Sequence, residues 1–261
     1  MANYHGHSED FTAIILAAGR NARLNQITNL PKTLLKVGRE CFLDRIVLSC
    51  KAYGISRIVI VVGYESEKIE KHVEEHPEIF GGLPVKTIYN SDYDVANNIV
   101  SFWLARGEMD RSFILFNSDV LFHDKVLEIL LKSNFGSALV IDDGKVLGPE
   151  EMKVRMNNNR LIVDISKSID PLTSEGEFIG ISKFSDQRII DKLLSRCRLL
   201  IDFGKTDVFY EEAFRLLSIE EPCIHGVSIK GLPWIEVDTP KDYEIAKKEI
   251  YSKIESTKLR T

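Results

Sequence analysis

Residues 16–38 read LAAGRNARLNQITNLPKTLLKVG and join an apolar segment to a polar, basic loop. The run FTAIILAA at 11–18 is continuously apolar, which is typical of a strand buried on both faces. The small side chains of Ala17, Ala18 and Gly19 let backbone N–H groups approach a nucleotide closely. The segment therefore predicts a phosphate-binding loop that follows a buried strand.

Three cations lie in this loop. Arg20, Arg23 and Lys32 suit a polyphosphate. Pro31 fixes the backbone immediately before Lys32 and so helps to aim that lysine. A basic surface loop without a ligand is the alternative interpretation, but the combination of small residues and cations at this spacing favours nucleotide binding.

Outward from this loop, strand and helix patterns alternate. Apolar runs predict strands at 57–63, 85–90, 112–119 and 137–141, and helical spacing predicts helices at 42–53, 66–75, 97–106 and 123–132. This β-α-β-α order implies a mostly parallel sheet with helices on both sides. We therefore expect the α/β class, as a three-layer, Rossmann-like domain.

The pattern changes after about residue 142. Segments 152–166 and 177–184 alternate like antiparallel strands. Beyond them we expect helices near 186–198 and 207–217 and strands at 224–229 and 234–237. A last helix is expected to begin at Pro240. We expect one domain over residues 11–261 with a smaller β-rich acceptor region at about 142–235. Residues 1–10 are expected to form a flexible tail, in which His5 and His7 either bind a metal or are incidental.

Composition narrows the class of protein. Hydrophobic residues make up 44% and charged residues 28%, as in ordinary globular enzymes. The formal net charge of −5, without a long Lys/Arg run, argues against a nucleic-acid partner. Neither a span of roughly 18–20 apolar residues nor a signal-peptide pattern is present. The spacing of Cys41, Cys50, Cys197 and Cys223 indicates reduced core thiols. We expect a cytoplasmic protein without a membrane partner and leave a homodimer open.

Two acidic positions are candidate metal ligands. Asp119 closes the predicted strand 112–119, and ligands of open α/β sheets gather beyond the carboxyl ends of strands. Glu236 and Asp238 lie two residues apart and so share one face of a strand. Mg²⁺ prefers one or two carboxylates together with phosphate oxygens. The alternatives are a strand-end turn for Asp119 and an N-cap before the last helix for Asp238.

Residues 16–38 resemble the signature LAAGxGxRLxxxTxxxPKxLxxV of the sugar-phosphate nucleotidyltransferase superfamily. The matching positions are Leu16, Ala17, Ala18, Gly19, Arg23, Leu24, Thr28, Pro31, Lys32, Leu34 and Val37. The resemblance implies that the loop from Leu16 through Arg20 and Asn21 to Arg23 holds a triphosphate. It also implies that Lys32 contacts the transferred phosphoryl group and that Asp119, Asp238 and Glu236 bind Mg²⁺. Asn21 replaces the second glycine, and asparagine tolerates positive φ comparatively well.

The segment YNSDYDVANNIVSFWLA at 89–105 is similar to a helix of bacterial phosphocholine and phosphonate cytidylyltransferases. This likeness implies that Asn90, Asn97 and Ser101 contact the nucleotide, although helix capping by asparagine is the alternative. The implied reaction transfers CMP from CTP to a small phosphomonoester or phosphonate and releases pyrophosphate. A sugar-1-phosphate uridylyl- or thymidylyltransferase and a non-catalytic nucleotide sensor are the alternative functions.

Four residues are candidates for binding the acceptor. Lys153 and Arg155 suit an anionic group, while Glu211 and Tyr210 suit an ammonium group. Solvated surface charges and core packing are the alternative interpretations. The sequence therefore predicts an acceptor with an amino or carboxylate group in preference to a bare sugar phosphate.

Overall fold

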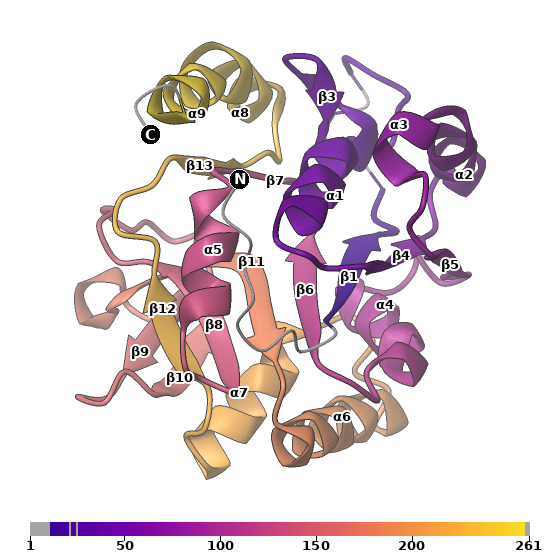
Figure 1. The fold of residues 1–261 in the computed structure, drawn as a ribbon. Helices are drawn as coiled ribbons and strands as arrows, with labels where there is room; N and C mark the ends of the chain where they lie inside the picture. Colours follow the sequence, from indigo (N-terminus) through magenta and orange to yellow (C-terminus); the bar gives the residue numbers. More distant parts are fainter. Residues whose placement is uncertain (1–10, 21, 25, 259–261) are drawn as a thin grey trace.

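A computed structural model describes residues 11–258, except 21 and 25 (Figure 1). The predicted tail at 1–10 and Asn21 thus lie outside the described residues. Strand β1 (Thr12–Ala17) is buried along its whole length and pairs in parallel with β4 (Arg57–Val62) and β6 (Phe113–Asn117). Strand β5 (Val85–Tyr89) extends this parallel arrangement beyond β4. The apolar run at 11–18 is explained by its central position in the sheet.

The second half of the chain widens the same sheet with antiparallel pairs. Strand β11 (Gly176–Phe184) is antiparallel to β6, to β8 (Ser137–Asp142) and to β9 (Lys153–Met156). Strands β9 and β10 (Ile162–Ser166) form a hairpin, and β12 (His225–Ser228) adds to β8 in parallel. The strand order is β10-β9-β11-β6-β1-β4-β5, with β8 beside β11. The predicted antiparallel segments at 152–166 and 177–184 are confirmed.

Helices cover both faces of the sheet (Figure 1). One face carries α1 (Phe42–Ala52), α2 (Ser66–Glu75), α3 (Pro77–Phe80) and α5 (Lys125–Lys132), and the other carries α4 (Asn98–Leu104), α6 (Gln187–Asp202) and α7 (Glu211–Glu220). Successive side chains of β1 alternate between the two cores: Ala13 and Ile15 face one, Ile14 and Leu16 the other. The predicted three-layer α/β class is confirmed.

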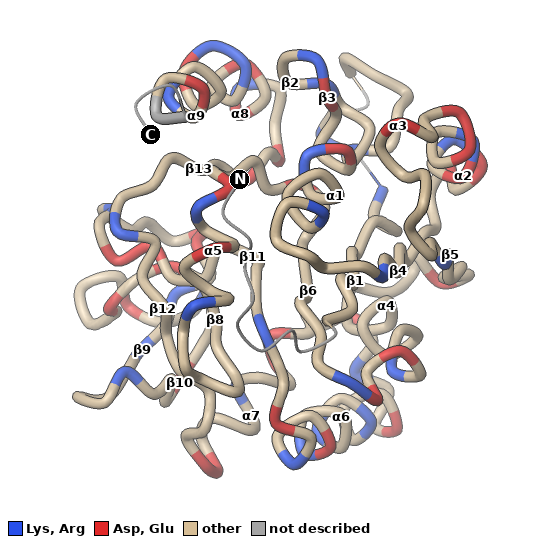
Figure 2. The backbone as a smooth tube through the Cα atoms, in the orientation of Figure 1, with Lys and Arg blue, Asp and Glu red and all other residues tan. Residues whose placement is uncertain are grey.

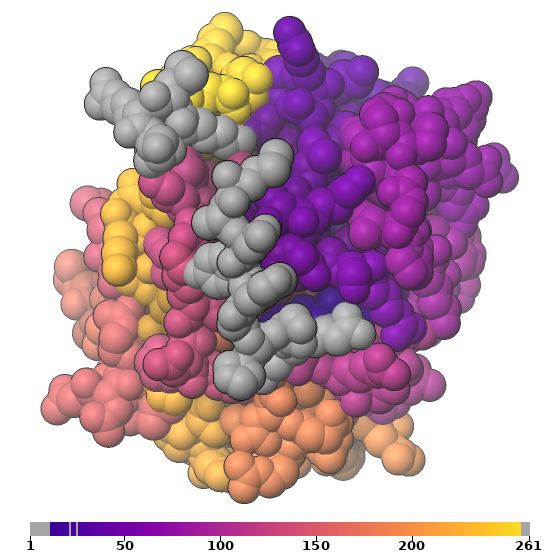
Figure 3. All heavy atoms as spheres, viewed as in Figure 1, coloured from indigo at the N-terminus to yellow at the C-terminus, as the bar shows by residue number. Residues whose placement is uncertain are grey.

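A third, smaller core joins the ends of the chain. It includes Leu24, Leu35 and Val37 from the N-terminal region, and Val237, Ala246 and Ile254 from the C-terminal region. The elements involved are η1 (Lys32–Leu34), β2 (Lys36–Val37), β3 (Glu40–Cys41), β7 (Val120–Phe122), β13 (Trp234–Glu236), α8 (Pro240–Ile245), η4 (Ala246–Ile250) and α9 (Tyr251–Lys258). In the space-filling view the yellow C-terminal helices pack directly on the indigo segment (Figure 3). This packing fixes the backbone on both sides of Lys32.

The surface carries both charge signs. Acidic and basic residues alternate along α2 and α6 (Figure 2). Within the described part of the chain, no helix combines the length and apolarity that a membrane crossing requires. The four cysteines are free thiols; Cys41, Cys50 and Cys197 are buried as expected, whereas Cys223 is only half-buried.

Candidate active site

A cleft of about 670 Å³ opens at the carboxyl ends of β1 and β6. The sheet, the loop after β1, the start of α4 and the segment around 207–211 form its walls. Most of the predicted site residues line it: Leu16, Ala17, Ala18, Gly19, Arg20, Arg23, Lys32, Asn90, Asn97, Ser101, Asp119, Glu211, Glu236 and Asp238. Strand ends that lie far apart in the sequence thus meet at one sheet edge, as expected for an open α/β fold.

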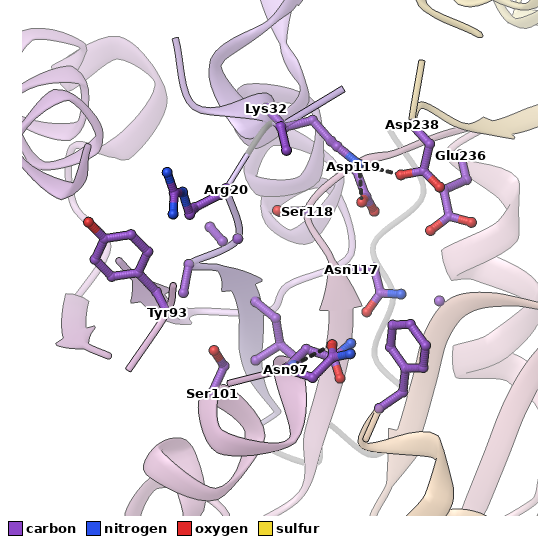
Figure 4. A pocket seen from close by; sticks show the side chains of 18 of the residues that line it. Arg20, Lys32, Tyr93, Asn97, Ser101, Asn117, Ser118, Asp119, Glu236 and Asp238 are labelled. Carbon is purple, nitrogen blue, oxygen red and sulfur yellow. Dashed lines mark hydrogen bonds and ion pairs between the residues drawn. The ribbon is translucent and has the colours of Figure 1, made fainter. Parts of the chain in front are cut away.

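Lys32 lies between two carboxylates in this cleft (Figure 4). Its Nζ donates a hydrogen bond of 2.8 Å to Asp119 Oδ2 and one of 2.6 Å to Asp238 Oδ1. Burial opposes the lysine charge, but Asp119 and then Asp238 outweigh it, so the pKa of Lys32 is raised. Pro31 precedes the short helix η1 with extended backbone (φ −51°, ψ 140°), which directs Lys32 into the cleft.

Pairing of two short strands brings the late acidic residues to Asp119. Strand β13 is antiparallel to β7, with Glu236 opposite Val120. Beyond this pair, the backbone N–H of Val237 donates to the carbonyl oxygen of Asp119 at 3.0 Å. Residues separated by nearly half of the described chain are therefore held in fixed register.

The N-cap of α8 is Thr239 and not Asp238. Thr239 and Asp242 form a reciprocal capping box, in which Asp242 accepts from the Thr239 backbone at 2.8 Å. The capping interpretation of Asp238 is therefore wrong, and its side chain is left to face Lys32. Burial would raise the pKa of Asp238, but the charge of Lys32, supported by Arg23, lowers it.

Asp119, Glu236 and Asp238 form a cluster of candidate metal ligands. One carboxylate oxygen of each lies within 4.8 Å of the others. Asp119 Oδ1 is buried without a hydrogen-bond partner. Glu236 opens onto the cleft but is surrounded by protein, so desolvation and then the charges of Asp119 and Asp238 raise its pKa. An unsatisfied oxygen within an all-oxygen donor set fits a hard divalent cation such as Mg²⁺.

The asparagines on the nucleotide side organise the wall of the cleft. Asn97 caps α4, because its Oδ1 accepts from the backbone N–H of Asn98 at 2.8 Å. The capping interpretation is therefore confirmed for Asn97, which also lines the cleft. Asn90 is buried and donates from Nδ2 to Ser101 Oγ at 2.9 Å. Contact of these three side chains with a nucleotide remains a prediction.

Tyr210 is a core residue and not part of the acceptor surface, contrary to the prediction. Its side chain is fully buried and stacks on Phe102 with 5.6 Å between ring centroids. The hydroxyl donates to Asn117 Oδ1 at 2.9 Å, and Asn117 does line the cleft. Gly180, at φ +81°, is required beneath Asn117, since a Cβ there would lie 2.7 Å from Asn117 Nδ2.

Lys153 and Arg155 also fall outside the cleft lining, contrary to the prediction that they bind the acceptor. Lys153 is fully buried, and its Nζ donates to the carbonyl oxygens of Gly148 at 3.1 Å, Pro149 at 3.1 Å and Glu151 at 3.0 Å. Buried backbone acceptors require partners, and the lysine satisfies three of them at once. Arg155 instead forms an exposed ion pair of 2.7 Å with Asp164.

The acceptor side of the cleft contains Glu211, Phe209 and Lys167, of which the sequence did not single out Lys167. Glu211 is buried, its Oε2 has no hydrogen-bond partner, and burial raises its pKa to about 7. Lys167 and Phe209 also line the cleft, with the Lys167 ammonium 5.1 Å from the Phe209 ring centroid. Lys167 follows β10 in a turn, where no motif or periodicity distinguishes it from other surface lysines.

Comparisons with known proteins agree with this geometry. Residues 13–137 match the family described as MobA-like NTP transferase domain. The chain therefore contains a nucleotidyltransferase domain over these residues. It is 26% identical over 245 residues to choline-phosphate cytidylyltransferase of Streptococcus pneumoniae, covering 91% of this chain and 99% of that protein.

Other relatives of this chain are longer. It is 27% identical over 244 residues to the bifunctional protein GlmU of Methanococcus maripaludis, covering 93% of this chain and 55% of the relative. Identity to the bifunctional IPC transferase and DIPP synthase of Aquifex aeolicus is 29% over 241 residues, or 91% and 51% of the two chains. The chain thus spans about half the length of these bifunctional relatives.

A solved structure shares the fold. The inositol-1-phosphate CTP transferase from T. maritima superposes with a TM-score of 0.76 at 22% identity, covering 96% of this chain and 98% of that one. At this identity the likeness establishes the fold.

Proposed function

We propose that this nucleotidyltransferase is a Mg²⁺-dependent cytidylyltransferase that joins CMP from CTP to a small phosphomonoester or phosphonate. The observation that carries the proposal is the placement of Lys32 between Asp119 and Asp238, beside the loop that begins at Leu16. The preference for CTP is supported by relatives and neighbours whose names specify cytidylyl transfer or CTP.

The arrangement suits phosphoryl transfer by positioning and charge. Arg20 and Arg23 are exposed cations on the loop and would hold the β- and γ-phosphates. Lys32 would stabilise charge on the α-phosphoryl group as an acceptor oxygen attacks phosphorus and pyrophosphate leaves. The acceptor oxygen is already anionic near neutral pH, so no general base is required. Catalysis then depends on orientation and preorganised charge.

Asp119, Asp238 and Glu236 would hold Mg²⁺ through carboxylate oxygens. When bound, the ion would neutralise phosphate oxygens of the triphosphate. Lys32 lies in the same part of the cleft and forms ion pairs with two of these carboxylates. One ammonium group thus only partly offsets the charge of the three-carboxylate cluster before substrate arrives.

The acceptor is proposed to carry a positively charged amino or quaternary ammonium group. Glu211 offers a buried oxygen without a partner, and Phe209 offers an aromatic face at the same end of the cleft. Lys167 lines the cleft and would bind the anionic group of the acceptor, which is the role that the sequence predicted for Lys153 and Arg155. A cation bound beside Glu211 would satisfy its charge and stabilise the ionised form.

A sugar-1-phosphate uridylyl- or thymidylyltransferase is the second candidate. It is favoured by the GlmU relatives and by the fold of a putative glucose-1-phosphate thymidylyltransferase from Bacillus anthracis, with a TM-score of 0.74 at 20% identity. A nucleotide sensor is disfavoured because Lys32 and Asp119 are both present and in contact. The cytoplasmic location and the homodimer remain predictions.

A substrate panel tests the proposal. The protein is incubated with Mg²⁺, one of CTP, UTP, dTTP, ATP or GTP, and a pool of small phosphates and phosphonates. Pyrophosphate release ranks the nucleotides, and mass spectrometry identifies the product. We expect CTP and an ammonium-bearing acceptor to give the highest kcat/KM. A higher kcat/KM with UTP or dTTP and a sugar phosphate would replace the proposal with the second candidate.

A further inference from the structure

A second cluster of potential metal ligands lies away from the cleft lining, between α1 and α2. Cys41 ends β3, Asp44 is in the first turn of α1, and His72 is in α2. Cys41 Sγ lies 3.6 Å from His72 Nε2, which lies 2.7 Å from Asp44 Oδ1. Cys41 and Asp44 are buried, and His72 is mostly buried. Three atoms of different chemistry thus converge on one point.

The donor set suits zinc. Thiolate, imidazole and carboxylate are all common Zn²⁺ ligands, and a site with three protein ligands leaves a fourth position for water. Zinc–ligand bonds of about 2.0–2.3 Å require separations between ligand atoms of roughly 3.3–3.6 Å in a tetrahedral site. The sulfur-to-nitrogen distance of 3.6 Å already meets this requirement. The nitrogen-to-oxygen distance of 2.7 Å would have to widen by about 0.6 Å.

A zinc ion bound by these three residues would connect α2 to α1, and the packing of α2 shows why such a connection would stabilise the structure. Ile69 is the one fully buried residue of this helix, so little apolar surface anchors it. Its other ties to the body of the protein include Lys68 Nζ, which donates to the carbonyl oxygen of Asn29 at 2.9 Å. Asn29 belongs to the loop between Gly19 and Lys32 in the nucleotide site. Fixing His72 to α1 would therefore steady a helix that also contacts this loop.

We propose that Cys41, Asp44 and His72 form a zinc-binding site that joins α1 to α2. It differs from the cluster of Asp119, Glu236 and Asp238 in containing sulfur and nitrogen donors, which favour zinc over Mg²⁺. Without metal, Asp44 accepts from His72 and from the backbone N–H of Cys41 at 2.8 Å. Binding replaces the hydrogen bond between His72 and Asp44 with bonds to the metal. The thiol proton of Cys41 is released to solvent, and the proton on His72 Nε2 moves to Nδ1, so that the neutral imidazole binds through Nε2.

Metal titration of the full chain tests this site. Zn²⁺ is titrated by calorimetry, and Co²⁺ is used as a spectroscopic probe, because a thiolate ligand gives a charge-transfer band in the near ultraviolet. His5→Ala and His7→Ala are introduced as a common background, since the sequence His-Gly-His can bind zinc independently. We expect one Zn²⁺ per chain in this background, a Co²⁺–thiolate band, and a Tm that rises with zinc concentration.

Variants locate the metal. We expect Cys41→Ser and His72→Gln each to weaken Zn²⁺ binding by about 10-fold or more, and Cys41→Ser to abolish the Co²⁺–thiolate band. Two control variants should keep both the Zn²⁺ affinity and the Co²⁺–thiolate band: Asp119→Asn, and Cys50→Ser, which alters a buried cysteine in α1. If Cys41→Ser does not fold, Asp44→Asn replaces it, because asparagine retains an oxygen for the Cys41 N–H. Absence of the thiolate band in the background protein, or unchanged zinc affinity in the folded variants, would overturn the proposal.

Discussion

The nucleotide side and the acceptor side of the cleft differ in how well residue type predicts where a side chain lies. On the nucleotide side, the predicted residues within the described part of the chain all line the cleft. On the acceptor side, only Glu211 of the four predicted residues does so. The nucleotide residues are tied to backbone features: the end of a buried strand, a Pro-Lys turn, and two acids at and just beyond the end of one short strand. The acceptor residues were chosen for their charge or aromatic character alone.

Lys153 shows why charge alone misleads. A strand lysine was expected to face an anionic ligand, but the turn at 148–151 exposes three carbonyl oxygens to the interior, and the ammonium group satisfies them. The strand pattern predicts the strand but contains no information about that turn. Variants on the nucleotide side should therefore lose catalytic activity. Variants of the predicted acceptor residues should instead alter the stability of the fold or the binding of the acceptor.

The largest effect is expected from the carboxylates. Asp119→Asn and Asp238→Asn should each reduce kcat by roughly 10³-fold or more, because each removes a charged metal ligand and a partner of Lys32. Activity is measured by pyrophosphate release across a Mg²⁺ titration, with circular dichroism as the control for folding. Full activity of the unaltered protein in excess chelator would show that no divalent cation is needed.

Lys32→Ala should lower kcat by roughly 10²-fold, since it removes one preorganised cation from the transferred phosphoryl group. Lys36→Ala is the matched control, because Lys36 is an exposed lysine on the neighbouring strand β2. Steady-state kinetics with saturating CTP and Mg²⁺ compare the two variants. Near-normal kcat in folded Lys32→Ala would show that this lysine has no role in the mechanism. Residue type would then predict function no better on the nucleotide side than on the acceptor side.

The sequence predicted the elements of the fold well, because burial on both faces and helical periodicity are local properties. The helix at 66–75 and the capped start of α4 at Asn97 match the structure closely. Long-range pairing was less accessible: the register of β7 with β13, which brings Glu236 and Asp238 to Asp119, has no local signal. The family resemblance supplied that proximity, whereas Lys167 had neither a motif nor a resemblance to identify it.

Glu211→Gln tests the one acceptor residue that was predicted correctly to line the cleft. We expect KM for an ammonium-bearing acceptor to rise by about 10-fold, with KM for CTP unchanged, because a charged hydrogen-bond acceptor is lost. Glu212→Gln is the matched control; Glu212 pairs with Arg215 at 3.1 Å and does not line the cleft. Equal effects of the two variants would show that the acceptor does not contact Glu211.

The pH dependence of acceptor binding sharpens this test. The pKa of Glu211 is raised to about 7 by burial, so the side chain is increasingly protonated as pH falls through that value. The ionised form binds an ammonium group, and KM for the acceptor should therefore fall as pH rises from about 6 to about 8. Glu211→Gln should flatten this profile. A neutral hydroxylated acceptor would not produce the same dependence.

Lys153→Met should destabilise the fold without affecting the chemical step. The variant keeps the apolar stem but leaves the carbonyl oxygens of Gly148, Pro149 and Glu151 without their donor. We expect a loss of about 2–4 kcal/mol in the free energy of unfolding, measured in urea, with kcat for the folded fraction close to normal. A selective rise in KM for the acceptor without destabilisation would show that Lys153 contributes to acceptor binding after all.

Arg155→Ala should have the smallest effect. Arg155 is half-exposed and its ion pair with Asp164 is open to solvent, where such pairs contribute about 0–1 kcal/mol. Asp164 also keeps a second partner, since Arg215 Nε donates to its other oxygen at 3.0 Å. Both kcat/KM and the urea midpoint should thus remain near those of the unaltered protein. A tenfold loss in kcat/KM for the acceptor would mean that β9 moves toward the cleft when substrate binds, and the separation between the two sides would then apply only to the unliganded state.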